Sequence, residues 1–266
     1  MQYDPIKRSL GSVFNSTPFL RKVFYFLLDV LLLRSWHIRS ELKKLDFNGV
    51  KHILDAGSGF GQYTFWMSKK FKQAQILAVD VKEEQVADCN GFFNKLGKQQ
   101  VTFEVGDLVT FVHPEKFDLV LCVDVMEHIE EDVQVLTNYC SSLKTGGMLL
   151  ISTPSNMGGS DVHDDGETSF IEEHVRDGYG IDEIEEKCKR AGFSRVEARY
   201  SYGAPGKLSW KLSMKYPMLM LNTSKMFFIL LPFYYVITMP LALILNAFDV
   251  RGSHETGTGL IVKAWK

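Results

Sequence analysis

The chain has 266 residues, of which 45% are hydrophobic and 23% charged, and its formal net charge is −2. This length suffices for one large hydrophobic core with an accessory element, not for a second full domain. The nearly balanced charge argues against a nucleic-acid-binding protein, which would carry a basic surface. The four cysteines lack Cys-x-x-Cys spacing, so they indicate small buried hydrophobes in a reducing compartment, not a metal or disulfide framework.

The N-terminal segment, residues 1–45, is apolar and basic. Thr17 and Pro18 predict the start of a helix, and a largely apolar run follows them. Between residues 5 and 40 there are six basic residues and one acidic residue, Asp29. This segment is predicted to face a membrane or, alternatively, to form part of a buried lid.

Residues 46–200 alternate between apolar strands and helices, which predicts an α/β fold with a doubly wound parallel sheet and right-handed crossovers. The predicted strands are 51–56, 75–80, 101–105, 117–123, 148–153 and 193–200, and the predicted helices are about 61–71, 83–96, 131–143 and 181–191. A final apolar stretch, residues 258–266, is expected to supply the last strand.

The first predicted strand runs directly into a turn with Gly57, Gly59 and Gly61 at alternate positions. Glycine tolerates backbone angles that other residues resist, so such a turn lets the backbone approach a ligand beside the N-terminus of a helix. A tight structural turn would also need glycine. However, Asp80 ends the next strand about 20 residues later, where open α/β sheets place an acid on ribose hydroxyls. The two features together indicate a ligand that contains a nucleoside.

Residues 201–257 form an insertion between the last two strands. Residues 198–248 contain five basic residues and no acidic one, and residues 226–248 carry no charge. The uncharged run is long enough to cross a bilayer, although Pro232 and Pro240 are expected to break it into short pieces. Because both flanking strands should pair in one sheet, we expect an interfacial or re-entrant cap instead of a single crossing. A buried lid over the substrate and a homodimer surface are the alternatives.

Four sequence stretches resemble class I S-adenosylmethionine-dependent methyltransferases: residues 54–61, the pair Val79-Asp80, residues 106–108 and residues 124–129. The pair Glu127-His128 and residues 149–155 are most similar to the O-methyltransferases of ubiquinone biosynthesis. The resemblance implies a Rossmann-like seven-stranded sheet with an antiparallel last strand.

The resemblance also implies S-adenosylmethionine as the cofactor, with its methionine portion at the glycine turn, its ribose on Asp80 and its adenine amino group on Asp107. The cofactor-binding residues it implies are Asp55, Gly57, Ser58, Gly59, Gly61, Tyr63, Asp80, Val81, Asp107, Leu108, Val123 and Asp124.

Methyl transfer to a hydroxyl requires removal of a proton, and His128 and His174 are the candidate bases, with Glu127 beside the first. On a helical turn, Asp124, Glu127 and His128 would share one face. This trio resembles the acid-x-x-Glu-His magnesium site of some ubiquinone-pathway enzymes, so Mg²⁺ is a second possible cofactor. Alternatively, the two acids orient the cofactor or the helix and His128 supports them.

We therefore expect an O-methyltransferase that acts on a lipophilic phenolic, quinone-like or aryl-polyene acceptor, in the cytoplasm and peripheral to the inner face of the membrane. A carbon or nitrogen methyltransferase acting on a sterol-like or phospholipid acceptor is the alternative. A catalytically idle lipid-binding or assembly protein of the same fold is a third possibility.

Overall fold

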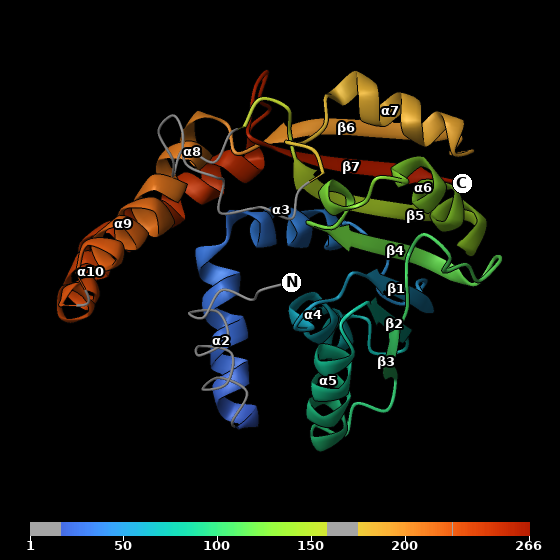
Figure 1. Cartoon of the computed structure of the whole chain (residues 1–266), viewed down its shortest axis with the longest axis horizontal. Coiled ribbons are helices and arrows are strands. Elements are labelled where there is room, and N and C mark those ends of the chain that lie inside the picture. The colour runs from blue at the N-terminus through green and yellow to red at the C-terminus, as the bar shows by residue number, and fades with distance from the viewer. Residues whose placement is uncertain (1–16, 159–174, 225) are drawn as a thin grey trace.

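The computed structural model describes residues 17–158, 175–224 and 226–266, and a seven-stranded sheet lies at its centre (Figure 1). The strand order is β3-β2-β1-β4-β5-β7-β6, and β7 runs antiparallel to both of its neighbours, β5 and β6, whereas the other neighbouring pairs are parallel. The strands are β1 His52–Ala56, β2 Gln75–Asp80, β3 Val101–Val105, β4 Phe117–Val123, β5 Leu143–Pro154, β6 Arg195–Ser201 and β7 Gly259–Trp265. The predicted α/β sheet with an antiparallel last strand is confirmed.

Helices cover both faces of the sheet. The core helices are α4 Gln62–Lys70, α5 Glu83–Lys95, α6 Asp132–Ser142 and α7 Ile181–Arg190. Alternate residues of one strand enter opposite cores: Ile53 packs with side chains of α4 and α5, whereas Leu54 packs with those of α6 and α7. Burial on both faces explains why central strands such as β2 and β4 read as largely apolar runs in the sequence.

The described part of the N-terminal segment, from residue 17 onward, forms α2, Pro18–Leu31, and α3, Leu33–Leu42, separated by the extended residue Leu32. Thr17 caps α2 as predicted, because its hydroxyl oxygen accepts a hydrogen bond from the backbone N–H of Leu20 at 3.2 Å. Side chains of both helices enter the core on the α4 and α5 face, so this segment is part of the folded body.

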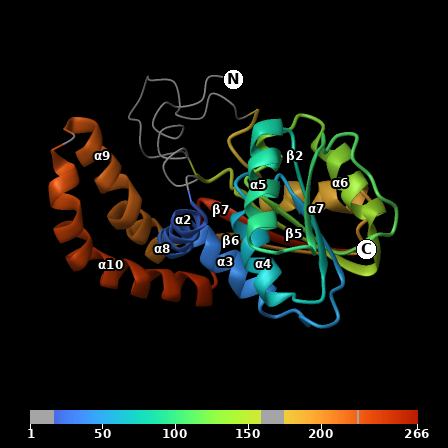
Figure 2. The ribbon, with the colours of Figure 1, turned by 90° about the horizontal axis from the view of Figure 1, so that it is seen from below.

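The insertion forms a helical hairpin that projects away from the sheet (Figure 2). Its outgoing arm comprises α8 Ala204–Trp210, a π-helical turn η2 Lys211–Lys215 and α9 Tyr216–Thr223, and its returning arm is α10 Phe227–Arg251. The expectation that prolines break the apolar run is wrong, because α10 continues through Pro232 and Pro240. A proline removes one backbone N–H donor from a helix, but contacts elsewhere along the helix can compensate for the lost hydrogen bond and keep the helix continuous.

Two tyrosines on α10 supply such packing across the helical hairpin. Tyr234 donates its hydroxyl hydrogen to the carbonyl of Leu212 at 2.7 Å, and Tyr235 donates to that of Ser213 at 2.9 Å. Both acceptors lie in η2, where the hydrogen-bond pattern departs from that of an α-helix. The two arms are therefore held in register.

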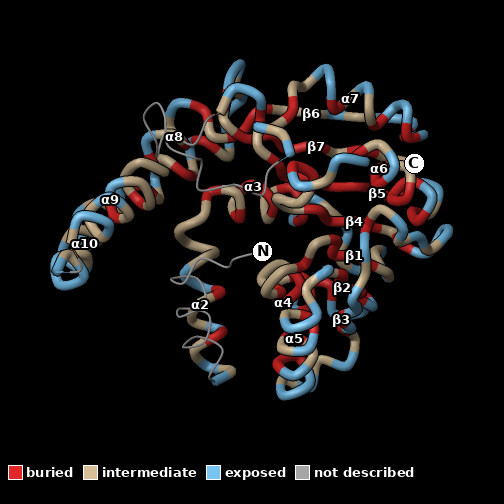
Figure 3. The backbone as a smooth tube through the Cα atoms, viewed as in Figure 1, coloured by how far each residue is buried: buried red, intermediate tan, exposed pale blue. Residues whose placement is uncertain are grey.

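A buried carboxylate fixes the root of the helical hairpin to the body. Asp249, near the end of α10, accepts hydrogen bonds from the backbone N–H groups of Tyr202 and Gly206, both at 3.0 Å. Its carboxylate also lies 2.8 Å from Nε2 of His37 on α3, and both side chains are fully buried. Figure 3 shows buried residues concentrated in the sheet and at this root, and mainly exposed or half-buried ones along the arms.

Candidate cofactor site

The glycine turn connects β1 to α4 at the carboxyl edge of the sheet. Gly57, Gly59 and Gly61 have φ angles of +73°, +50° and +74°, which side chains with a Cβ rarely adopt. A Cβ on Gly57 would also lie 2.2 Å from Cγ2 of Val125, whereas one on Gly59 would meet open space. Gly57 therefore allows close packing against Val125, whereas the backbone of Gly59 faces open space.

Polar groups converge on the turn from the neighbouring strands. Asp80, at the end of β2, accepts the backbone N–H of Gly59 at 2.8 Å and that of Lys82 at 3.0 Å. Asp55 is buried, and the Thr64 hydroxyl donates to it. Burial, with the nearby charge of Asp80, raises the pKa of Asp55 to about 7 despite that hydrogen bond.

Ser58 shows that the turn has unused binding capacity. Its hydroxyl oxygen is buried and has no hydrogen-bond partner among the residues that the structure describes. Buried hydroxyls normally have partners, so an unpartnered one beside the open space at Gly59 fits a missing polar ligand. These residues fit the cofactor that the sequence predicts at this turn.

The turn is supported from behind by α2, through contacts that the sequence did not predict. Arg21 is 1% exposed, and it donates to the carbonyl of Phe60 at 3.0 Å and to Asp88 at 2.5 Å. The Tyr25 hydroxyl donates to the same Phe60 carbonyl. In the sequence, the only sign of this role was a basic residue in a mostly apolar helix. The contact itself could not be predicted, because Phe60 lies far from Arg21 in the sequence.

Asp124 follows β4 and faces a second residue that the sequence did not predict. Asp124 has a φ of +50°, and its carboxylate forms an ion pair with Arg34 of α3. The backbone N–H of Arg34 donates to the hydroxyl of Tyr202 at 3.0 Å, and Tyr202 also has a positive φ, +55°. Two strained residues thus meet at Arg34, and strained backbone is typical of functional sites.

The trio after β4 does not share one face. Residues 126–128 form a 3₁₀ turn, and Asp124 precedes it in a left-handed conformation, so the helical spacing that the sequence suggested does not apply. Asp124 turns to Arg34, Glu127 is buried and accepts the Thr153 hydroxyl at 3.1 Å, and His128 is exposed. No group of His, Cys, Asp and Glu suited to a metal occurs within the described ranges. These side chains therefore do not fit the predicted Mg²⁺ site.

Burial raises the pKa of Glu127 above its ordinary value, although the hydrogen bond from Thr153 acts in the opposite direction. The backbone carbonyl of Glu127 accepts the N–H of Val175 at 3.0 Å. The other candidate base, His174, lies outside the described residues.

The remaining predicted cofactor residues lie at or beyond the carboxyl ends of β1 to β4. Asp107 is exposed and accepts the N–H of Val109 at 2.9 Å, while Leu108 is buried beside it. Val81 is exposed and Val123 is half-buried. The hydroxyl of Tyr63 lies 3.2 Å from that of Ser35 on α3. These positions lie at the same carboxyl edge of the sheet as the glycine turn.

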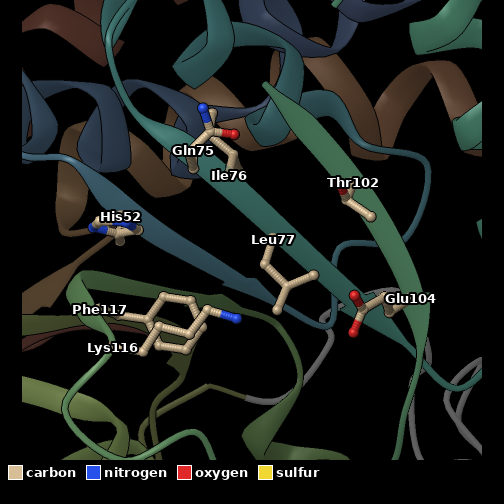
Figure 4. Close-up of a pocket in the computed structure, with 8 residues that line it drawn as sticks. All are labelled: His52, Gln75, Ile76, Leu77, Thr102, Glu104, Lys116 and Phe117. Carbon is tan, nitrogen blue, oxygen red and sulfur yellow. The ribbon is translucent and has the colours of Figure 1, made fainter. Parts of the chain in front are cut away.

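A separate hollow lies at the opposite end of the sheet (Figure 4). Its lining includes His52, Gln75 and Phe117, which begin β1, β2 and β4. It is therefore remote from the glycine turn. Ligands of open parallel sheets bind at the carboxyl ends of the strands, so this hollow does not belong to the cofactor site.

Comparison with known proteins decides the family. Residues 48–199, more than half of the chain, match the methyltransferase domain family. The chain belongs to this methyltransferase family. The resemblance to class I S-adenosylmethionine-dependent methyltransferases that the glycine turn and strand ends indicated is thereby confirmed.

Curated relatives of this methyltransferase differ in the acceptor atom. Phosphoethanolamine N-methyltransferase 1 of Zea mays is 26% identical over 159 residues, covering 59% of this chain and 31% of its own length. Ubiquinone biosynthesis O-methyltransferase of Coxiella burnetii is 26% identical over 106 residues, covering 39% of this chain and 43% of its own length. The chain thus spans about a third of the length of the plant relative.

Solved structures agree on the fold. Phosphoethanolamine N-methyltransferase 2 of Haemonchus contortus, in complex with phosphomonomethylethanolamine and S-adenosylhomocysteine, matches with a TM-score of 0.63 and 18% identity, covering 91% of this chain and 56% of that one. The [4+2]-cyclase SpnF matches with a TM-score of 0.59 and 16% identity, covering 88% and 82%. At this identity the likeness concerns the fold alone.

Proposed function

We propose that this methyltransferase transfers the methyl group of S-adenosylmethionine to an oxygen of a lipophilic, phenolic acceptor at the cytoplasmic face of a membrane. The observation that carries the proposal is the presence, on one chain, of the open glycine turn and a helical hairpin whose large apolar side chains are exposed. Large exposed apolar patches mark membrane or protein interaction surfaces.

The cofactor half of the proposal uses residues at the glycine turn. Asp80 would accept hydrogen bonds from the ribose hydroxyls, and the exposed Asp107 would accept one from the adenine amino group. The free Ser58 hydroxyl and the bare backbone of Gly59 would contact the methionine portion. The cofactor supplies an electrophilic methyl group, so the protein has to align the acceptor and remove its proton.

The acceptor half uses the turn after β4. A phenolic oxygen is a good nucleophile once it is deprotonated, and an imidazole can take a proton near neutral pH. His128, exposed at the rim, is the proposed base. Glu127 holds the turn through Thr153 and through the backbone of Val175, so its proposed role is to position His128.

Methyl transfer to nitrogen is the second candidate. It is favoured by the phosphoethanolamine N-methyltransferases among the curated relatives. A phospholipid amine would satisfy both this chemistry and the exposed apolar surface.

Incubation of the protein with membranes and methyl-labelled S-adenosylmethionine tests the proposal. Label recovered in the organic extract as an aryl methyl ether, and reduced in His128→Ala, would support it. Glu186→Gln, an exposed change on α7, is the matched control. Label on a lipid amine would favour the nitrogen candidate, and vesicle binding without turnover would indicate an idle lipid-binding protein.

A further inference from the structure

The helical hairpin, residues 204–251, leaves the body and returns to it on one side. Its outgoing arm follows β6 and its returning arm precedes β7, and these strands pair from Arg195↔Trp265 to Ser201↔Gly259. By length and composition α10 could cross a membrane. A crossing would separate two paired strands, so any membrane entry has to be that of a hairpin that returns.

Exposed apolar side chains surround much of α10. Phe228, Ile229, Val236 and Ile237 are between 60% and 78% exposed. At about 100° per residue, the exposed apolar positions from 228 to 241 cover an arc of about 220°. Only 6% of the most apolar stretch of the helix is buried, so α10 is not a buried lid over the sheet. A helix that is apolar over such an arc suits lipid better than the narrower seam of a helix pair.

Five hydroxyl groups of the helical hairpin donate hydrogen bonds within it. Thr223 and Thr238 donate to the carbonyls of the preceding turn, at 2.9 Å in both cases. Ser209 donates across the arms to Ala242 at 3.0 Å, beside the cross-arm bonds of Tyr234 and Tyr235. Hydrocarbon offers no hydrogen bonds, so polar groups that enter it have to be satisfied internally. In water this arrangement would not be required.

All four charged residues between residues 204 and 248 are lysines, and the three that the structure describes lie on the outgoing arm. Lys207, Lys211 and Lys215 follow one another at intervals of four residues, starting near the root. No acidic residue occurs between residues 204 and 248. Lysines at the level of the headgroups attract anionic lipid, and their long stems can reach from apolar surroundings to the interface.

From these observations we infer that the helical hairpin enters an anionic bilayer from one side, with the end of α9 and the start of α10 leading, and does not cross it. Fifteen residues of α10, 227–241, precede its first buried residue, Ala242, and extend about 22 Å. This exceeds one leaflet's share of a hydrocarbon core about 30 Å thick but cannot cross the whole core. The inference rests on the membrane contact of the proposed function and deepens it, and it does not require methyl transfer.

Depth-dependent fluorescence tests the inference in the full chain. All four native cysteines are buried, so single cysteines introduced at Ile229, Ile244 and Glu186 can be labelled selectively with an environment-sensitive dye. On vesicles of phosphatidylcholine and phosphatidylglycerol, we expect the strongest blue shift and quenching by mid-bilayer quenchers at 229, weaker effects at 244 and none at 186. Equal depth at 229 and 244 would overturn insertion in favour of a hairpin that lies flat.

A charged pair of substitutions adds an independent measurement. Val236→Asp with Ile237→Asp changes two exposed side chains, so the fold should persist, and it should lower vesicle partitioning by on the order of 100-fold or more. A blue shift that grows with protein concentration in the absence of vesicles would assign the surface to a second copy instead. Turnover of a detergent-dispersed acceptor without insertion would refute this inference alone, and insertion without turnover would refute the methyl transfer alone.

Discussion

Replacing Gly57 with alanine should destabilise the fold, whereas replacing Gly59 should mainly weaken cofactor binding. Both glycines have positive φ angles, for which a Cβ costs about 1–2 kcal/mol. At Gly57 the added Cβ would also lie 2.2 Å from Cγ2 of Val125. Displacing that side chain in a packed region adds about 1–3 kcal/mol, so Gly57→Ala should lose about 2–5 kcal/mol of unfolding free energy.

Gly59 provides the matched control, because its Cβ would meet nothing within 4 Å. Gly59→Ala should lose only about 1–2 kcal/mol of stability, yet its methyl group would occupy the space proposed for the cofactor. Urea unfolding measures the first quantity, and calorimetric titration with S-adenosylmethionine measures the second. Wild-type affinity in Gly59→Ala, or equal stability of the two variants, would refute this division of roles.

Three further predictions concern the supporting residues. Arg21→Met should cost about 1–3 kcal/mol of unfolding free energy and weaken cofactor binding, because it removes the donor to the Phe60 carbonyl. Urea unfolding and calorimetry measure the two effects, and Lys22→Met, a change at an exposed neighbouring residue, is the control. Arg34→Gln should reduce the kcat/KM of methyl transfer on the order of 10-fold, because it removes the ion pair that holds Asp124. Solvent screens this partly exposed pair, so the unfolding free energy should change by less than about 1 kcal/mol. Unchanged kinetics would exclude Arg34 from the site. Because the pKa of Asp55 is raised to about 7 in the folded protein, its contribution to stability is fully present below about pH 4 and is lost as the pH rises towards 7. Between pH 5 and pH 7, urea unfolding of Asp55→Asn should therefore show a smaller loss of unfolding free energy than the wild-type protein does.

Much of the sheet and its binding turn could be predicted because local sequence determines them. Strands such as residues 75–80 and 117–123 are bounded as predicted, since the two-sided burial of a parallel sheet produces largely apolar runs. The glycine turn was recognisable because positive φ angles and close packing leave few alternatives to glycine.

The contacts made by Arg21 and Arg34 could not be predicted, because their partners are distant in sequence. Phe60 lies 39 residues from Arg21, and Tyr202 lies 168 residues from Arg34. The predicted grouping of Asp124 with Glu127 and His128 failed for a local reason. It assumed a regular helix where the backbone first takes a left-handed residue and then a 3₁₀ turn.

The root of the helical hairpin has a consequence for the choice of acceptor. Asp249 ties α10 to the backbone N–H groups of Tyr202 and Gly206 and to His37 of α3, the helix that also brings Arg34 to Asp124. If the helical hairpin inserts as inferred, this junction sets a constant height of the proposed cofactor site above the bilayer. Acceptors would then be sorted by the distance between their membrane-anchored tail and their reactive atom, so a series of acceptors that differ only in spacer length should show a sharp optimum in turnover.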